Sequence, residues 1–438
     1  MVTEVSGAPA QRLEPPTFGA VGRFMQATEI DARLLGMIVA LILIGVGFQF
    51  ASGGVFLTPR NLWNLSVQTA TIAVLANGMV LIIVSRNIDL SVGSLMGFLG
   101  MIMGAVQTDF LPPLLGYDHP LSWIITIVIG VVAGVIVGGF QGYIIAYLQV
   151  PAFIVTLGGL LVWRGAAWWV ASGKTLAPLD TIFQIFGGGG ANGSIGALAS
   201  WLVGLVACIA VVASIVNGRR QRRRFNFPLR PVWAEVTLGV IGCVVALGAV
   251  AVINAYPMPV GLAKTYAAAH NIPWPDNGLF ISLGIAIPVL IAIGSAMVVA
   301  FITSRTRFGR YVFAIGGNPE AAELGGINTR WVIMKTFILM GVLCAIAAVI
   351  ATARLNAATN SLGTNNELYT IAATVIGGTS FAGGVGTIAG AMLGALLMQT
   401  LQSGMQLMGI DSPLQNIVVG AVLVLAVGID TYYRRRTA

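Results

Sequence analysis

Long apolar runs alternate with short polar stretches along almost the whole chain. A membrane-spanning helix needs about 20 mainly apolar residues, and the runs predict about twelve spans. In chain order they are 34–51, 62–85, 92–106, 123–147, 153–171, 195–216, 232–253, 279–302, 332–352, 367–384, 387–408 and 417–429. The tenth run is weakly apolar and broken by glycines, so it either crosses fully or re-enters. The pattern predicts an all-α, polytopic helical membrane protein.

Composition excludes the water-soluble class. Apolar residues make up 57% of the chain and charged residues 9%, whereas a soluble domain carries about 25% charged residues. Cys208, Cys243 and Cys344 each fall inside an apolar run. They form neither a disulfide framework nor a zinc-binding spacing. We therefore predict no metal site and no cofactor bound by this chain.

The net charge of +8 would suggest a nucleic-acid partner in a soluble protein. In a membrane protein, an excess of Lys and Arg marks the cytoplasmic side. If the N-terminus is cytoplasmic, the large majority of the 23 basic residues fall inside, including those of 219–224, 305–310 and 434–436. This predicts two cytoplasmic termini, an even number of spans and no nucleic-acid partner. The run RRQRRR at 219–224 could bind lipid, but we interpret it as a topology anchor.

One transmembrane domain lies between a polar N-terminal segment and a polar C-terminal segment. Residues 1–33 are proline-containing and of mixed charge, which predicts a flexible cytoplasmic tail. Residues 34–430 form the transmembrane domain, and residues 431–438 form a basic cytoplasmic tail.

The longest cytoplasmic stretch between two late spans, 303–331, contains a short helix signal. Asn318 is a good N-cap, Pro319 suits the first helical position, and Glu320 is an acid in the first turn. Gly325 and Gly326 supply a left-handed stop. The result is about two helical turns, which serve either as a capped connector or as a docking segment.

No catalytic constellation stands out along the chain. HExxH, GxSxG and the phosphate-loop pattern are missing from the sequence, and the glycines at 187–190 have no following Lys. We expect no catalytic residue in this chain, no enzymatic activity and no ATP site.

Polar breaks inside the membrane are candidates for a translocation path, since broken helices mark such paths in transporters. An alternative interpretation is that the turn at 87–91 serves only to cap the helix of the third span. Arg164 lies inside a span and needs a partner, for which Asp89 and Glu367 are the acidic candidates. The eight candidates are Asn87, Asp89, Ser91, Arg164, Gly377, Gly378, Thr379 and Ser380.

Four motifs occur in one order along the chain: NIDLSVGS, VPAFIVTLGGLLVWRG, FGRYVFAIGGNPEAAELGGIN and IAATVIGGTSFAGGVGTIAGA. Together they resemble the monosaccharide permeases of ribose- and xylose-type ABC importers, from Leu34 to Asp430. An inserted span pair at about 195–254 added to a ten-span core resembles the xylose branch. One departure is the pair Arg86 and Asn87, where many ribose-type relatives have two glycines.

The resemblance implies a permease subunit that carries a monosaccharide, D-xylose in preference to ribose, across the bacterial inner (plasma) membrane. It implies three partners: a cytoplasmic ABC ATPase that binds the ATP, a periplasmic sugar-binding protein and a second permease copy. It also implies that the loop 303–331 couples to the ATPase. The implied coupling residues are Gly309, Gly317, Asn318, Glu320, Ala321, Ala322, Gly326 and Ile327.

Two other functions remain as alternatives. A secondary transporter could have twelve spans, but its usual long loop after the sixth span is short here. A membrane enzyme or scaffold would need a constellation that the sequence does not offer.

Overall fold

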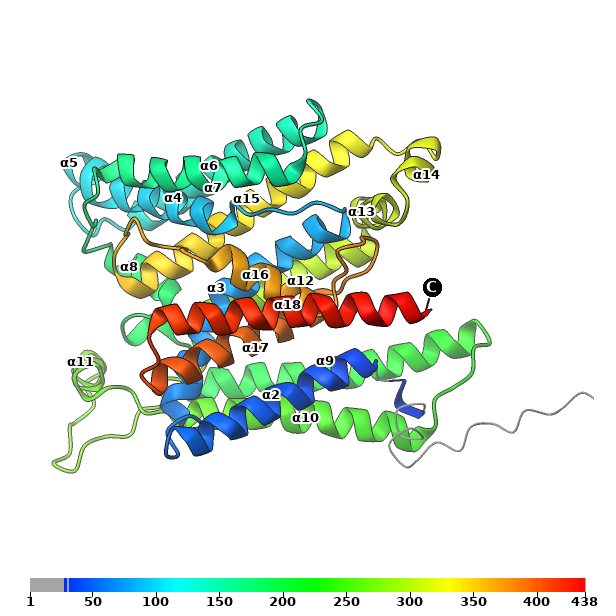
Figure 1. Ribbon diagram of the computed structural model, residues 1–438. Helices are drawn as coiled ribbons and strands as arrows, with labels where there is room; N and C mark the ends of the chain where they lie inside the picture. Colours follow the sequence, from blue (N-terminus) through cyan, green and yellow to red (C-terminus); the bar gives the residue numbers. More distant parts are fainter. Residues whose placement is uncertain (1–26, 30, 438) are drawn as a thin grey trace, which may run out of the picture.

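The computed structural model of the protein describes residues 27–29 and 31–437, and within them the chain is helical, with no strand and four isolated β-bridges (Figure 1). The predicted flexible tail, 1–33, lies mostly outside the described residues.

The first half of the chain contains α2 (Ala32–Ala51), α3 (Pro59–Val84), α4 (Val92–Ala105), the π-helical turn η1 (Val106–Phe110), α5 (Pro112–Leu115), α6 (Ser122–Ala146), α7 (Ala152–Ala171), α8 (Thr181–Gln184), and the 3₁₀ turns η2 (Ile185–Gly187) and η3 (Ala191–Gly193). The second half contains α9 (Gly196–Arg224), α10 (Val232–Asn254), α11 (Val260–Ala269), α12 (Ile287–Arg305), α13 (Arg307–Gly317), α14 (Pro319–Leu324), α15 (Thr329–Leu355), α16 (Asn366–Ile376), α17 (Ile388–Leu407) and α18 (Ser412–Thr437).

Nine helices of the described chain are long and apolar enough to cross a membrane. They are α2, α3, the continuous stretch Val92–Leu115 formed by α4, η1 and α5, and α6, α7, α9, α10, α12 and α15, and they coincide with the first nine predicted runs. Helices α17 and α18 cover the eleventh and twelfth runs. Helix α17 carries several glutamines and is less apolar, whereas α18 continues through 431–437, where the sequence predicted a separate basic tail.

The eighth predicted span begins later than expected. Helix α12 starts at Ile287, with Pro288 in its first turn, and not at Leu279. The preceding residues are extended, because their backbone bonds to other loops: Ile195 N donates to Ile285 O at 3.0 Å and Met258 N donates to Ile281 O at 2.7 Å. Apolarity alone could not separate this buried extended segment from the helix that follows it.

The tenth predicted span is not a continuous helix. Helix α16 has 11 residues, which at 1.5 Å per residue covers about 16 Å of a hydrocarbon core of about 30 Å. The preceding segment, 357–365, runs as a non-helical strip along α4: Ala358 lies at Gly104 near the end of α4, and Glu367 lies at Gly93 near its start. The strip and α16 together cover the length of the bundle.

Helix α3 is the centre of the core. It packs against α12, α15, α16 and α17 and is buried over almost its whole apolar length. Tight helix contacts surround it: at Gly134 and Gly138 of α6, a Cβ would lie 2.4 Å from Gly341 O and 2.3 Å from Phe337 O of α15. The glycine repeat of α6 therefore serves close packing within one copy.

The periphery consists of α2 and the hairpin formed by α9 and α10, which lie beside one another in Figure 1. Most of their side chains face outward. The loop between α9 and α10, the helices α13 and α14 and the C-terminus all lie toward one end of the bundle, and α5, α8 and α11 lie toward the other. The positive charges of 219–224 and 305–310 thus gather at one end, as the sequence predicted.

Candidate functional site

Two helices, not one, fill the loop between α12 and α15. The chain bends sharply after α12, and Thr306 caps α13 by accepting a hydrogen bond from Gly309 N at 3.2 Å. A side chain at Gly309 would come within 2.2 Å of Thr303 O. Gly309 therefore lies buried inside this corner, and its role is to let α13 fold back on α12. The sequence reading treated this part only as a turn.

Helix α14 confirms the predicted caps. Asn318 Oδ1 accepts a hydrogen bond from Ala321 N at 3.0 Å, Pro319 starts the helix, and Glu320 lies in its first turn. The stop differs in detail, because Gly326 alone has a left-handed backbone, with φ +79°, while Gly325 has φ −74°.

The outer face of α14 consists of Glu320, Ala321, Glu323 and Leu324, whereas Ala322 is buried against the bundle and Ile327 is half-buried. Leu324 is the most exposed large apolar side chain in this region, at 91%. A single exposed apolar side chain is common on protein surfaces and does not by itself mark a contact, so Leu324 only adds an apolar point to the outer face of this capped helix. The sequence reading missed it because a single Leu in a helix-forming run carries no signal of its exposure.

Arg86 ties this helical loop to the membrane core. Its guanidinium donates to Gly316 O and Gly317 O, both at 2.7 Å, at the end of α13. A cation there complements the unpaired carbonyls of a helix C-terminus. A bulky side chain in place of glycine would be expected to keep other segments of the backbone away from this turn. The contact exists, and it is made by the side chain, while Arg86 itself has φ +63°.

The loop after α16 joins the same junction. Gly384 N donates to Val84 O at 3.0 Å, and a side chain at Gly383 would come within 2.5 Å of Arg86 Cγ. The end of α3, the end of α13 and the loop 377–387 thus meet around one arginine. A displacement of α13 can reach α3 and the broken α16–α17 segment through this junction.

The predicted turn at 87–91 is held by internal hydrogen bonds, and its residues Asp89 and Ser91 are buried. Asp89 Oδ1 accepts from Ser91 N at 2.8 Å and from Ser91 Oγ at 2.6 Å. Gln141 Nε2 of α6 donates to Ser91 Oγ at 3.1 Å. Asn87 bonds within its own turn, to Ser85. These bonds hold Ser91 at the start of α4, but neither the Asp89 nor the Ser91 side chain accepts a hydrogen bond from the first N–H groups of the helix.

Arg164 holds the non-helical strip beside α4. Its Nη1 donates to Leu362 O at 2.9 Å and Asn360 O at 3.1 Å. Backbone carbonyls that lie at membrane depth outside a helix need such donors, because the hydrocarbon core offers no water to donate hydrogen bonds to them. Of the two acids considered as partners, Glu367 is the electrostatic neighbour, and Asp89 is engaged by Ser91. The hydrogen-bond partners are backbone carbonyls, which sequence reasoning could not foresee.

The second predicted break is a tight, buried loop. Thr379 and Ser380 are both almost fully buried, and Ser380 Oγ accepts from Ala382 N at 3.1 Å. Gly377 lies so close to α17 that a Cβ would come within 2.4 Å of Gly390 C and O, while Gly378 has φ +89°. Within the described chain, Thr379 Oγ1 has no hydrogen-bond partner.

A polar cavity of about 210 Å³ lies elsewhere, between α3, α15, α16 and α17. Gln68 accepts a hydrogen bond from Gln399 Nε2 at 3.0 Å across it. Amides donate and accept at once, so a cluster of them suits a ligand rich in hydroxyl groups. None of the eight path candidates lines this cavity. Its polar lining is Gln68, Thr71, Arg354, Asn366, Gln399, Gln402 and Gln406.

The glutamines of α17 were the available signal in the sequence. Gln399, Gln402 and Gln406 recur at helical spacing in an otherwise apolar run, so they share one face. Only the fold shows that this face meets α3 and the start of α16.

A bundle of membrane-length helices with a broken helix beside a polar cavity has the architecture of a multi-pass transport protein. The comparison with known proteins narrows the class. The chain belongs to the family described as the permease component of the branched-chain amino acid transport system, whose model matches residues 61–427.

Curated relatives of this chain are sugar permeases. The xylose transport system permease protein XylH of Escherichia coli K12 is 35% identical over 97% of this chain and 98% of its own length. XylH of Haemophilus influenzae is 36% identical over 93% and 98%. The ribose import permease protein RbsC of E. coli K12 is 29% identical over 90% and 92%. No solved structure matches the chain.

Proposed function

We propose that this chain is the membrane permease subunit of an ATP-binding-cassette importer that carries D-xylose into the cytoplasm. The observation that carries the proposal is similarity to two xylose permeases over almost their full length. The region of similarity includes the hairpin α9–α10, which distinguishes this chain from the ten-span core expected of ribose-type permeases.

Coupling to the ATPase runs through α13 and α14. A chain without a phosphate loop receives energy by contact, and it switches only if the ATPase states bind it with different free energies. Asn318, Glu320, Ala321 and Leu324 offer an exposed, capped helix for this contact. Buried Gly309 and Ala322 set its position, while Gly317, Gly326 and Ile327 shape its ends.

The sugar passes the polar cavity on the outer side of α16. Its glutamines exchange hydrogen bonds with sugar hydroxyls, and the broken α16 can rearrange beside it. The turn at 87–91, Arg164 and the loop 377–380 support the moving parts of this path and do not line the cavity.

The working assembly contains two copies of this chain, the ATPase and a periplasmic sugar-binding protein in the bacterial inner membrane. We propose twelve crossings and two cytoplasmic termini, with the strip 357–365 and α16 counted as one crossing. The common location of the basic loops at one end of the bundle supports this orientation.

A tagged copy expressed in a bacterial strain that lacks its own xylose uptake tests the proposal. We expect an ATPase subunit to co-purify and radiolabelled xylose to enter the cells. Uptake should stop when the catalytic residue of that ATPase is mutated. Uptake that continues without ATP hydrolysis, driven by a proton gradient, would instead establish a secondary transporter.

Ribose is the second candidate substrate, favoured by the 29% identity to RbsC over 90% of this chain. Competition of labelled xylose uptake by a panel of unlabelled pentoses separates the two. Xylose should compete at the lowest concentration, and stronger competition by ribose would reassign the substrate.

A further inference from the structure

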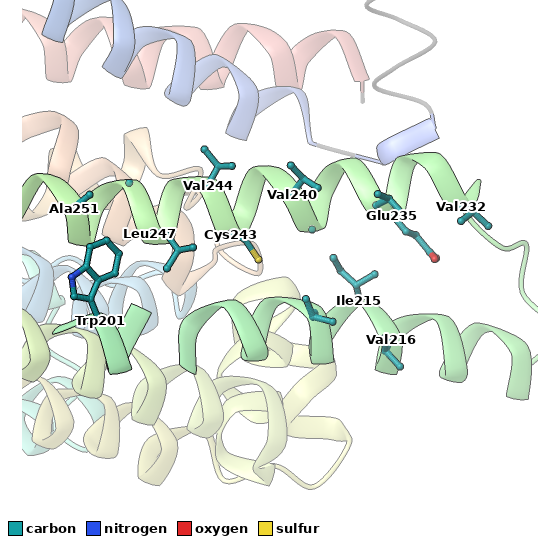
Figure 2. Close-up of a pocket in the computed structure, with 14 residues that line it drawn as sticks. Trp201, Ile215, Val216, Val232, Glu235, Val240, Cys243, Val244, Leu247 and Ala251 are labelled. Carbon is teal, nitrogen blue, oxygen red and sulfur yellow. The ribbon is translucent and has the colours of Figure 1, made fainter. Parts of the chain in front are cut away.

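An apolar groove of about 930 Å³ runs along the α9–α10 hairpin, away from the proposed coupling and sugar sites. Figure 2 shows Ile215, Cys243 and Leu247 pointing between the two helices, with Trp201 at one end and Glu235 at the other. Small residues make the recess: Gly239, Gly248 and Ala251 of α10 border it. Nearly all of its surface is apolar, so it suits a hydrocarbon chain.

Positive charge gathers at the Glu235 end of the groove. Arg219 Nη1 forms an ion pair with Glu235 Oε2 at 2.5 Å. Glu29 forms ion pairs with Arg222 and Arg230. The three remaining arginines at this end are Arg220, Arg223 and Arg224. They are exposed and form no ion pair with a carboxylate in the part of the chain that the structure describes. Phe225 and Phe227 are exposed beside them.

The arginine end of the groove, from Glu235 to Val244, matches one leaflet, and the groove continues beyond it to Ala251. From Glu235 to Val244 the rise along α10 is about 14 Å, close to half of a hydrocarbon core of about 30 Å. A lipid tail laid against this stretch places its phosphate at the level of the free arginines. The cytoplasmic leaflet carries anionic lipids that basic residues attract.

We propose that the α9–α10 hairpin binds an anionic phospholipid of the cytoplasmic leaflet, its acyl chain in the groove and its phosphate at Arg220, Arg223 and Arg224. A second copy of the chain fits less well. Two copies in one membrane are parallel, so a two-fold contact through this face would set the same arginines at the same depth against each other.

Photo-crosslinking in nanodiscs tests the proposal, and it needs no transport activity. The full chain is placed in equal parts of phosphatidylglycerol and phosphatidylethanolamine, with a trace of phosphatidylglycerol that carries a diazirine in its acyl chain. After irradiation, mass spectrometry maps the labelled peptides, and the lipid-facing surface of α2 serves as the reference for unspecific contact. We expect preferential labelling around Cys243, and a matched phosphatidylcholine probe should not show this preference.

Paired variants separate the two parts of the site. Replacing Arg220, Arg223 and Arg224 by Gln should reduce the preference about a hundredfold, since each arginine near an anionic surface contributes about 1 kcal/mol, and replacing them by Lys should keep it. Replacing Arg434, Arg435 and Arg436 by Gln removes the same charge elsewhere and should change nothing. Gly239→Leu fills the groove and should abolish labelling there, whereas Gly218→Leu, outside the groove, should not.

Three results would overturn the proposal: equal labelling by both probes, unchanged labelling in the Gln triple variant, or efficient crosslinking of Cys243 between two copies. Each of these outcomes leaves the xylose transport assay untouched, so failure here is distinguishable from failure of the proposed function.

Discussion

Arg86 shows how one side chain can decide the rigidity of a functional loop. It makes two hydrogen bonds of 2.7 Å to consecutive carbonyls at the end of α13. Only a planar guanidinium supplies two donors in this geometry. The contact is partly exposed, so its effect on total stability is small. Its effect on the transmission of movement between α13 and α3 is larger, because the junction holds few other polar bonds.

Arg86→Lys should therefore leave the protein folded but poorly coupled. We expect xylose uptake to fall about tenfold, the equivalent of one lost charged hydrogen bond, while the ATPase still co-purifies. Arg60→Gln, which removes an exposed arginine at the opposite end of α3, is the matched control. Normal uptake in Arg86→Lys would refute the role of this junction.

Arg164→Leu should destabilise the fold, since it removes the donors of two carbonyls in the strip beside α4. The cost should be about 2 kcal/mol, measured as reduced thermal stability in detergent. Arg164→Lys keeps one donor and should recover part of the loss. Trp169→Leu, a lipid-facing change one turn away, is expected to be neutral. A stable Arg164→Leu protein would show that other groups satisfy these carbonyls.

Glu29 confers a pH dependence on the hairpin loop. The hydrogen bonds from Arg222 and Arg230 lower the pKa of Glu29 from 4.5 to about 2. Because the folded-state pKa is lowered, the ion pair is fully present above about pH 4.5 and is lost as the pH falls toward 2. Spin labels at Ala27 and Pro228 should keep a narrow distance distribution at pH 7 and 5 and broaden below pH 3. The Glu29→Gln variant should be broad at each pH, and an unchanged distribution at low pH would contradict the assignment.

At the scale of elements, the segments to which we assign coupling and the transport path are short helices and non-helical strips, not long helices. Helix α14 is too short to be stable alone. It persists because Asn318 and Gly326 cap it and Ala322 packs on the bundle. The strip 357–365 lies at membrane depth because the glycines of α4 leave room for its backbone, and Arg164 satisfies its carbonyls.

Changes in the buried half of α14 should destabilise the helix. Changes in charge on its outer half should leave the helix folded but weaken the docking of the ATPase. Glu320→Lys and Leu324→Asp should each weaken ATPase retention about tenfold, measured by co-purification, with the permease still folded. Glu323→Asp, which keeps the charge on the same exposed surface, is the comparison. Full retention in both variants would move the contact to α13.

At the scale of the molecule, the cavity and the proposed coupling loop lie toward opposite ends of the bundle. The loop 377–387 connects α16 and α17 to the Arg86 junction, and α17 carries the glutamines. A movement at α13 can therefore reach the cavity through α17 without a chain of specific side-chain contacts.

Gln399→Leu should impair recognition of the sugar and not assembly. Loss of one buried amide should raise the xylose concentration for half-maximal uptake about tenfold, with ATPase co-purification unchanged. Gln415→Leu, on α18 outside the cavity, serves as the control. An unaltered concentration dependence in Gln399→Leu would exclude the cavity from the path.

The sequence by itself determined the class of the protein, most of its membrane helices and the capped helix α14. These features depend on local signals: the length of apolar runs, the distribution of Arg and Lys, and the residues at helix ends. The same signals failed at Leu279, where a partly buried extended segment is as apolar as a helix. At the tenth run they left open whether the segment crosses the membrane or re-enters.

Tertiary structure decided how the polar residues pair. Arg164 bonds carbonyls of a strip almost 200 positions away in the chain, and Arg86 bonds the end of α13. Gln68 and Gln399 meet across a cavity, and Leu324 proves to be exposed. No local pattern encodes these facts, because each depends on which distant backbone atoms are brought within hydrogen-bond reach, and that is set by the packing of whole helices.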